Sequence, residues 1–154
     1  MNSVLLVCTA NICRSPMAEA VLRAQGLFAE VQSAGARAAP RGEPVDARAA
    51  RALQQRGYQL PRRWRSRRVQ AEDLQRFDLV LAMDQDNLRD LRELAPPALQ
   101  PRLRLFLDCV PGRAGQEVPD PYFGSPQGFE HVLDLLELGA TSLRQALQRG
   151  GPPP

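Results

Sequence analysis

A cysteine, an arginine and a serine near the N-terminus have the spacing of an anion-binding loop. Five residues separate Cys8 from Arg14, and Ser15 follows directly. A loop of this length between a strand and a helix can point several backbone N–H groups at one site, where the positive end of the helix dipole adds to them. Arg14 can hold two phosphate oxygens in a planar fork. We therefore expect phosphate to be bound by the whole loop, Cys8, Thr9, Ala10, Asn11, Ile12, Cys13, Arg14 and Ser15.

The thiol of Cys8 is the candidate nucleophile of this loop. The positive field that attracts phosphate also favours the ionised thiolate. In-line attack on phosphorus would form a phosphocysteine, while the loop amides and Arg14 stabilise charge on the equatorial oxygens. Ser15 can donate a hydrogen bond to the sulfur and make it a better leaving group. Asn11 tolerates a left-handed backbone and can tie the loop to itself.

Each of these residues also has an ordinary explanation when it is taken alone. Cys8 could be a small buried side chain, and Arg14 could be a surface charge at the start of a helix. The combination of Cys, Asn, Arg, Ser and Pro at fixed spacing, directly after an apolar run, favours catalysis over that explanation.

The elements that must position the loop are predicted by hydrophobic periodicity. Apolar runs indicate strands over 4–7, 30–33, 79–82 and 103–107, and helical spacing indicates helices over 16–26, 44–57, 84–95 and 125–147. Strands alternating with helices predict an α/β fold, a doubly wound three-layer sandwich with a four-stranded parallel sheet and helices on both faces. Ligands bind beyond the carboxyl ends of such strands, where Cys8 lies. The segment 108–121 is predicted to be a long loop.

Composition indicates an ordinary globular protein. The 154 residues are 44% hydrophobic and 24% charged, and no apolar run approaches the length of a membrane span. We expect a single domain over residues 1–149 and a disordered Gly/Pro tail over 150–154. The N-terminus lacks the features of a secretory signal, and three cysteines do not form an even disulfide framework, so we expect a cytoplasmic protein with thiol chemistry.

Charge and histidine content exclude several function classes. A net charge of +3 is too small to indicate nucleic-acid binding. The arginines of the segment 62–68 surround Trp64 and form either a solvated basic segment or a docking patch for an acidic or phosphorylated partner. No residues have the spacing of metal ligands, and we expect no metal and no cofactor. His131, the single histidine, falls on a predicted helix and is not a candidate base.

The loop strongly resembles the signature of the low-molecular-weight protein-tyrosine phosphatases, in their bacterial form. Further family motifs follow in order over residues 3 to 148, namely Ser33-Ala34-Gly35, Pro44 with Asp46, Ser66-Arg67, Phe77-Asp78, Met83-Asp84 with Asn87, and Asp120-Pro121-Tyr122. Larger tyrosine phosphatases share the Cys and Arg spacing, but there the general acid precedes the signature. The resemblance implies a phosphotyrosine protein as substrate and a tyrosine autokinase as one possible partner, with no membrane contact and a monomer or weak dimer.

The resemblance also implies roles for individual residues. Asp120 corresponds to the general acid, Tyr122 and Phe123 to aromatic walls of the substrate pocket, and Cys13 to the partner of a reversible disulfide with Cys8. The alternative is that Cys13 is a core thiol in the first helical turn. Supporting roles fall to Asn11, Ser15 and Ser33.

Four positions depart from the common family pattern. Ala10 replaces a glycine, Phe123 replaces a tyrosine, Ala39 stands where many relatives carry an aromatic, and Trp64 stands where some carry a supporting histidine. Ring stacking on the substrate should therefore depend mostly on Tyr122 and Phe123.

Three alternative functions exist on the same fold. A thiol-dependent arsenate reductase needs further redox cysteines, but residues 83–97 contain none. Protein-arginine phosphatases carry Thr where this chain has Ile12, and the apolar side chain favours tyrosine substrates. A non-enzymatic phosphate-binding docking module would predict damage at Cys8, Arg14 or Asp120, yet all three are present.

Overall fold

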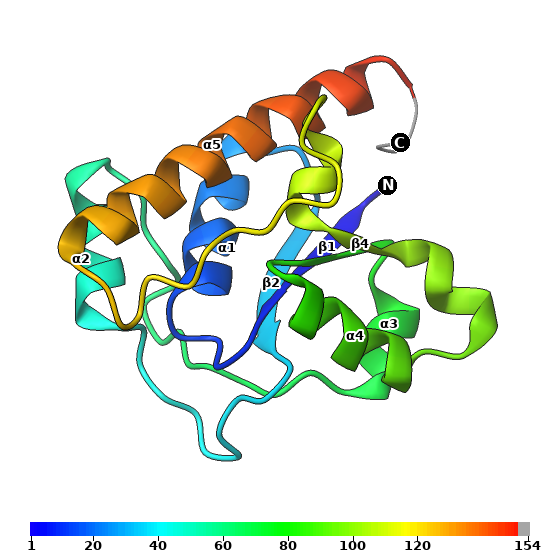
Figure 1. Ribbon diagram of the computed structural model, residues 1–154, viewed down its shortest axis with the longest axis horizontal. Coiled ribbons are helices and arrows are strands. Elements are labelled where there is room, and N and C mark those ends of the chain that lie inside the picture. Colours follow the sequence, from blue (N-terminus) through cyan, green and yellow to red (C-terminus); the bar gives the residue numbers. More distant parts are fainter. Residues whose placement is uncertain (151–154) are drawn as a thin grey trace.

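A four-stranded parallel sheet forms the centre of the molecule (Figure 1). The computed structural model describes residues 1–150. The strand order is β2-β1-β3-β4, with β1 at Ser3–Cys8, β2 at Glu30–Gly35, β3 at Leu79–Ala82 and β4 at Leu103–Leu105. In the register of the sheet, Cys8 faces Gly35 and Val7 faces Ala82, so the ends of three strands meet at one edge.

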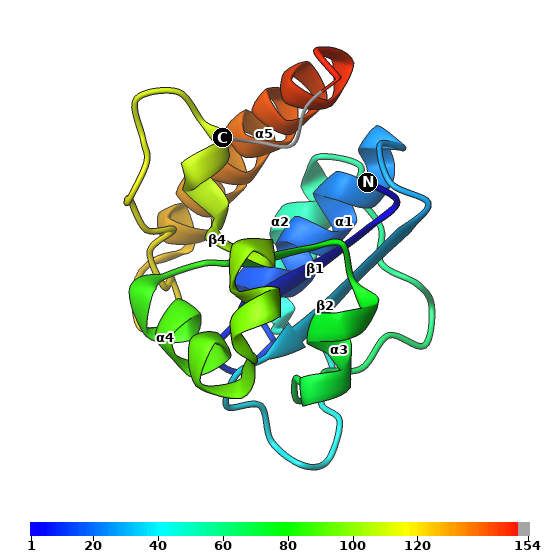
Figure 2. The same cartoon turned by 90° about the vertical axis from the view of Figure 1, so that its right-hand side faces the viewer.

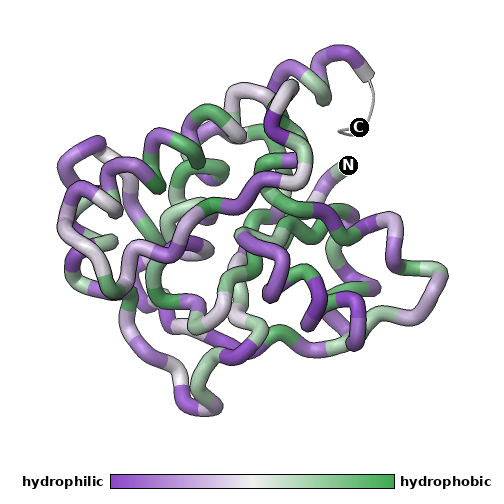
Figure 3. The backbone as a smooth tube through the Cα atoms, viewed as in Figure 1, coloured by the Kyte–Doolittle hydropathy of each residue, from purple (hydrophilic) through white to green (hydrophobic). Residues whose placement is uncertain are grey.

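Helices cover both faces of the sheet (Figure 2). One face packs against α1, Arg14–Gln25, α2, Ala47–Gln55, and α5, Pro126–Gln148. The other face packs against α3, Ala71–Arg76, and α4, Gln85–Leu94. Successive residues of β1 alternate between the two cores, because side chains of a strand point to opposite faces. Hydrophobic residues accordingly line the central strands, and hydrophilic ones predominate on the outer turns (Figure 3).

This arrangement confirms the predicted α/β sandwich. Strand β3 has the predicted bounds, and Asp84 caps α4 as predicted, because its carboxylate accepts a hydrogen bond from the backbone N–H of Asn87 at 2.8 Å. The long C-terminal helix begins at Pro126, directly after Ser125.

Several predicted boundaries were wrong by two or three residues. The first helix begins at Arg14 and not at Pro16, and β2 continues to Gly35 and does not end at Ser33. The helix expected over 44–57 begins only at Ala47, because the Asp46 carboxylate accepts hydrogen bonds from the backbone N–H groups of Arg48 and Ala49 and so caps it there. The strand expected over 103–107 ends at Leu105. The Asp108 carboxylate accepts a hydrogen bond from the Leu105 N–H, and residues 106–109 turn into a short 3-10 helix.

Besides the 3-10 helix over 106–109, two short helices were not predicted. They are α3 and a 3-10 helix at Pro97–Arg102. Each has six residues, which is too short for helical periodicity to show. Of the predicted tail, Gly150 lies in a turn, and residues 151–154 lie outside the described residues. None of the helices within residues 1–150 is long and apolar enough to cross a membrane.

Candidate active site

The loop of residues 8–13 leaves β1 at the carboxyl edge of the sheet and leads into α1. Its first carbonyls are held by the chain that follows β2, because the N–H groups of Ala36 and Arg37 donate to the Cys8 and Thr9 carbonyls at 2.8 Å each. Gly35 lies between these segments. A Cβ there would stand 2.7 Å from the Thr9 carbonyl oxygen, so only glycine lets strand β2 end this close to the loop.

Asn11 fixes the curvature of the loop. It has a φ of 59°, the left-handed conformation expected for it. Its side chain is fully buried, and its amide nitrogen donates to the hydroxyls of Ser15 at 2.7 Å and Ser33 at 3.0 Å. Its amide oxygen accepts the Arg67 backbone N–H at 2.9 Å. The loop is thus tied to α1, to β2 and to the segment before α3.

A buried carboxylate extends this network away from the loop. Glu19 on α1 is 2% exposed and accepts hydrogen bonds from the Ser33 hydroxyl at 2.6 Å, the Trp64 indole N–H at 3.0 Å and the Arg23 guanidinium at 3.0 Å. Trp64 therefore does support the loop, through Glu19 and Ser33. The sequence reasoning missed Glu19. Its position four residues after Ser15, on the same face of α1, was the available signal.

Ser15 connects the network to the sulfur. Its hydroxyl lies 3.0 Å from the Cys8 sulfur and accepts a hydrogen bond from Asn11. Its other acceptor, the Ala34 carbonyl, is farther away at 3.4 Å. The Asn11 amide donates a hydrogen bond to the oxygen of the Ser15 hydroxyl. The hydroxyl's own proton is therefore available to the Cys8 sulfur.

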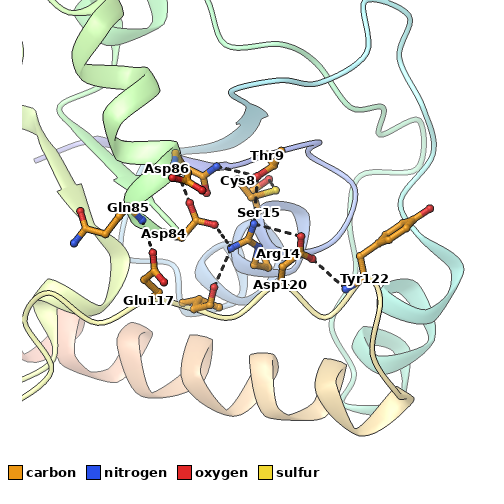
Figure 4. A network of polar contacts seen from close by, with 12 residues as sticks. Cys8, Thr9, Arg14, Ser15, Asp84, Gln85, Asp86, Glu117, Asp120 and Tyr122 are labelled. Carbon is orange, nitrogen blue, oxygen red and sulfur yellow. Dashed lines mark hydrogen bonds and ion pairs between the residues drawn. The ribbon is translucent and has the colours of Figure 1, made fainter.

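Arg14 has one nitrogen fixed by the protein and one facing the loop (Figure 4). Its Nη1 donates to the Asp84 carboxylate at 2.7 Å and to the Val118 carbonyl at 2.9 Å. Its Nη2 lies 3.4 Å from the Thr9 hydroxyl and 3.8 Å from the Asp120 carboxylate. The side chain is only 3% exposed, so the guanidinium is held rigidly below the pocket.

The segment that carries Asp120 is anchored to the end of β3. The Val118 N–H donates to the Met83 carbonyl at 2.8 Å, and the Glu117 carboxylate accepts the Gln85 N–H at 2.8 Å. The Asp120 carboxylate accepts the Tyr122 N–H at 3.0 Å and is 47% exposed at the mouth of the pocket. It can therefore reach both the loop and solvent.

Two aromatic rings stand beside Asp120. Tyr122 and Phe123 contact each other edge to face with centroids 4.9 Å apart, and Phe123 is 93% exposed. Arg48 on α2 holds this segment, because its Nη1 donates to the Tyr122 carbonyl at 2.9 Å and its guanidinium lies over the Tyr122 ring at 5.2 Å. Asp46 in turn orients Arg48 through two hydrogen bonds. The sequence reasoning did not identify Arg48.

These residues enclose a pocket of about 370 Å³ above the loop. Among the predicted site residues, Asn11, Ser15 and Ser33 lie behind the loop as its support, and the others line the pocket. Glu43 is an addition that no motif indicated, and Ala39 is not part of the wall. The pocket is lined by Cys8, Thr9, Ala10, Ile12, Cys13, Arg14, Glu43, Asp120, Tyr122 and Phe123.

The other two cysteines differ from Cys8 in their surroundings. Burial, with Asp46 as the next cause, raises the pKa of the Cys13 thiol to about 12. Burial likewise raises the pKa of Cys109 to about 12, and its sulfur donates to the Phe106 carbonyl. Both stay protonated thiols near neutral pH, which leaves them poor nucleophiles. Within residues 1–150, no three His, Cys, Asp or Glu side chains are grouped to hold a metal ion.

Comparison with known proteins identifies the family. Residues 3–152 match the family described as low molecular weight phosphotyrosine protein phosphatase. The chain is 42% identical to a low molecular weight protein-tyrosine-phosphatase of Streptomyces coelicolor, over 94% of this chain and 93% of that protein. It is 40% identical to a putative member from Synechocystis, over 94% and 95% of the two chains.

A solved structure shows the same fold. The protein tyrosine phosphatase of Entamoeba histolytica, with Hepes in its active site, superposes with a TM-score of 0.88 at 34% identity, covering 97% of this chain and 99% of that one. This chain therefore belongs to the low molecular weight protein-tyrosine phosphatases, a family of phosphoric monoester hydrolases.

Proposed function

We propose that Cys8, Arg14 and Asp120 divide the hydrolysis of phosphotyrosine into two steps. In the first, the Cys8 thiolate attacks phosphorus, the bond from phosphorus to the tyrosine oxygen breaks, and Asp120 gives its proton to that oxygen. In the second, Asp120 takes a proton from water as the water attacks phosphorus, and the sulfur leaves as a thiolate. Inorganic phosphate and tyrosine are the products, and the enzyme returns to its starting state.

What carries this assignment is the convergence of the three groups on one pocket. Cys8 and Asp120 both line it, and the Arg14 nitrogen that faces it lies 3.8 Å from the Asp120 carboxylate. A phosphate above the sulfur would accept hydrogen bonds from Arg14 and from the N–H groups of the loop. These donors are fixed in advance, so they need little rearrangement to stabilise the transition state.

Ser15 assists the second step in this proposal. Its hydroxyl, 3.0 Å from the sulfur, stabilises the thiolate as it leaves the phosphocysteine. Removal of this donor by Ser15→Ala should slow hydrolysis of the intermediate more than its formation. A burst of p-nitrophenol followed by a slower steady rate would then appear in rapid-mixing experiments.

Two substitutions test the assignment of the nucleophile and the acid. Cys8→Ser should abolish turnover of p-nitrophenyl phosphate, while Asp120→Ala should lower kcat by about 10²–10⁴-fold with little loss of inorganic phosphate binding. Iodoacetate should alkylate Cys8 faster than free cysteine near neutral pH, and phosphate should protect it. Activity retained in Cys8→Ser would refute the mechanism.

The walls of the pocket favour an aryl phosphate. Ile12, Tyr122 and Phe123 present apolar surface on which a phenyl ring can pack. A phosphoarginine side chain carries a charged, hydrogen-bonding group, and Ile12 offers it no acceptor. Matched peptides with phosphotyrosine or phosphoarginine at one position would test this preference, and equal kcat/KM for both would contradict it.

We infer that the substrate is a phosphotyrosine protein, with a bacterial tyrosine autokinase as one candidate, and that the protein acts in the cytoplasm as a monomer or weak dimer through a single domain over residues 1–149. The bacterial relatives support this setting. Capture of phosphoproteins from a cell extract by Asp120→Ala, released by excess phosphate, would identify the substrate.

Cys13 is proposed as a redox partner of Cys8. Both thiols line the same pocket. Peroxide would oxidise the Cys8 thiolate to a sulfenic acid, and Cys13 would then displace water to form the disulfide. Because its raised pKa keeps Cys13 protonated, this second reaction should accelerate as pH rises. Mass spectrometry of peroxide-treated protein should show the cross-link in the wild type but not in Cys13→Ser.

A further inference from the structure

A hollow lined by arginines lies next to the catalytic pocket. Its volume is about 510 Å³, and its walls are Pro44, Arg62, Arg63, Trp64 and Arg65. The Trp64 N–H donates to the Pro61 carbonyl at 3.0 Å, which closes a turn whose central residues are Arg62 and Arg63. Both side chains are exposed, and the turn holds them at the rim of the hollow.

Among the arginines that the structure describes, those of this hollow differ from most others in having no carboxylate partner. Arg23, Arg37 and Arg56, for example, each form an ion pair with a carboxylate. Within residues 1–150, the guanidinium groups of Arg62, Arg63 and Arg65 make no hydrogen bond or ion pair to the protein. Their donors are therefore available to an anion from outside.

Trp64 gives the hollow a rigid aromatic wall. The side chain is half-buried, and its indole nitrogen is bound to the buried Glu19 carboxylate at 3.0 Å. That hydrogen bond leaves the exposed part of the ring free to pack against a ligand. Guanidinium groups beside an aromatic surface suit a ligand that carries a phosphate on a phenyl ring.

The hollow and the catalytic pocket share a wall. Glu43 lines the pocket above Cys8, and the next residue, Pro44, lines the hollow. The basic segment is fixed to this wall, because the Glu43 carbonyl accepts the Ser66 N–H at 2.8 Å and the Glu43 N–H donates to the Ser66 hydroxyl at 2.8 Å. The Asp46 N–H, donating to the Ile12 carbonyl, ties the same loop to the phosphate-binding loop. Both sites thus keep a constant separation.

We propose that this hollow binds a second phosphotyrosine of the same substrate chain while the first occupies the catalytic pocket. This deepens the proposed function and rests on it, because the first phosphotyrosine must enter above Cys8. An extended chain advances about 3.3 Å per residue, so peptides that differ in the spacing between the two phosphotyrosines can measure the separation of the two sites. The phosphate dianion would bind Arg62, Arg63 and Arg65 through charge-assisted hydrogen bonds. Glu43, between the sites, disfavours an acidic residue directly beside the first phosphotyrosine.

Peptides with one hydrolysable phosphotyrosine test the proposal. One series carries a second, non-hydrolysable phosphonate analogue of phosphotyrosine three, four or five residues away, and the reference peptide carries tyrosine there. We expect the wild type to show about tenfold higher kcat/KM for the best doubly charged peptide than for the reference. In Arg62→Ala/Arg63→Ala this ratio should fall to near one. For each enzyme, the kcat/KM of the doubly charged peptide is divided by the kcat/KM of the reference peptide. A smaller fraction of folded enzyme lowers both values equally and leaves the ratio unchanged.

The matched control removes two other exposed arginines. Arg92→Ala/Arg149→Ala changes the net charge equally at the ends of α4 and α5 and should keep the tenfold ratio. A ratio near one in the wild type, or an unchanged ratio in Arg62→Ala/Arg63→Ala, would overturn the proposal. An equal gain from a glutamate at the second position would overturn its preference for phosphate. Failure to hydrolyse the reference peptide would instead refute the proposed function.

Discussion

The ion pair between Arg14 and Asp84 can be tested by an isosteric change, Asp84→Asn. The Asp84 carboxylate makes two contacts. Its Oδ1 accepts a hydrogen bond from the Asn87 N–H at 2.8 Å and caps α4, and its Oδ2 accepts one from Arg14 Nη1 at 2.7 Å. Asparagine has one oxygen and can serve only one of these donors, so its NH₂ group must face the other. Asparagine caps helices well, and we expect the cap to be kept and the Arg14 contact to be lost.

The expected loss of stability follows from the burial of Arg14. Breaking a buried ion pair costs about 3–5 kcal/mol, whereas a single hydrogen bond to a charged group contributes about 1.5–3 kcal/mol. Arg14 is 3% exposed but keeps the Val118 carbonyl as an acceptor. We therefore expect a loss of about 2–3 kcal/mol, which lowers Tm by about 4–12 °C for a chain of this size. kcat should fall by about tenfold or more, because Arg14 loses its fixed orientation.

Asp90→Asn on the same helix is the matched control. The carboxylates of Asp84 and Asp90 are each 19% exposed, but Arg37, the partner of Asp90, is 65% exposed where Arg14 is 3% exposed. A surface pair of this kind contributes under about 1 kcal/mol. Urea denaturation and p-nitrophenyl phosphate kinetics of both variants give the comparison. If Asp84→Asn lost no more stability than Asp90→Asn, the burial of Arg14 would not explain the stability that its ion pair contributes.

Two further predictions concern stability alone. Gly139→Ala in α5 should destabilise the protein by about 1–2 kcal/mol, because a Cβ there would lie 2.1 Å from the buried Phe106 ring and the overpacking exceeds the gain of about 1 kcal/mol in helix propensity. Gly128→Ala in the same helix, whose Cβ would meet its nearest neighbour at 3.5 Å, should show no loss in the same urea titration. Burial and the hydrogen bond to Glu137 raise the pKa of Tyr58 from its ordinary value near 10 to about 12. The folded state thus favours the protonated phenol, and this stabilisation is complete below pH 10 and lost as the pH rises towards 12. The difference in urea midpoint between the wild type and Tyr58→Phe should shrink over that range, and a constant difference would contradict the assignment.

The sequence predicted those parts of the fold that local patterns determine. Strand β3 is a continuous apolar run, and its bounds were predicted correctly because burial on both faces leaves no polar residue within it. Boundaries that depend on one side chain were harder to predict. The Asp46 carboxylate decides where α2 begins and the Asp108 carboxylate decides where β4 ends, and an aspartate in sequence does not show which N–H groups it will accept.

The candidate site likewise has a part that the sequence predicted and a part that it did not. The loop around Cys8 is contiguous in sequence, so its composition and spacing were sufficient to predict an anion site. The supports of the loop come from distant segments. Trp64 reaches Glu19 across 45 residues and Arg14 reaches the Val118 carbonyl across 104, and neither contact follows from spacing. Trp64 stood in the sequence as a departure from the family, and only the fold shows that its indole N–H binds the Glu19 carboxylate.

The contacts around Arg14 bring the proposed phosphate site and Asp120 together. Asp84 and the Val118 carbonyl occupy Nη1, so Nη2 remains for a ligand, and without one it lies 3.8 Å from Asp120. A bound phosphate dianion would engage Nη2 and add negative charge beside Asp120. The Asp120 carboxylate is also 47% exposed at the mouth of the pocket, within reach of water. In the proposed reaction, departure of tyrosine would open the pocket to water beside the Asp120 carboxylate. In the proposed reaction, one carboxylate at this position can therefore serve first as acid for the leaving tyrosine and then as base for the attacking water.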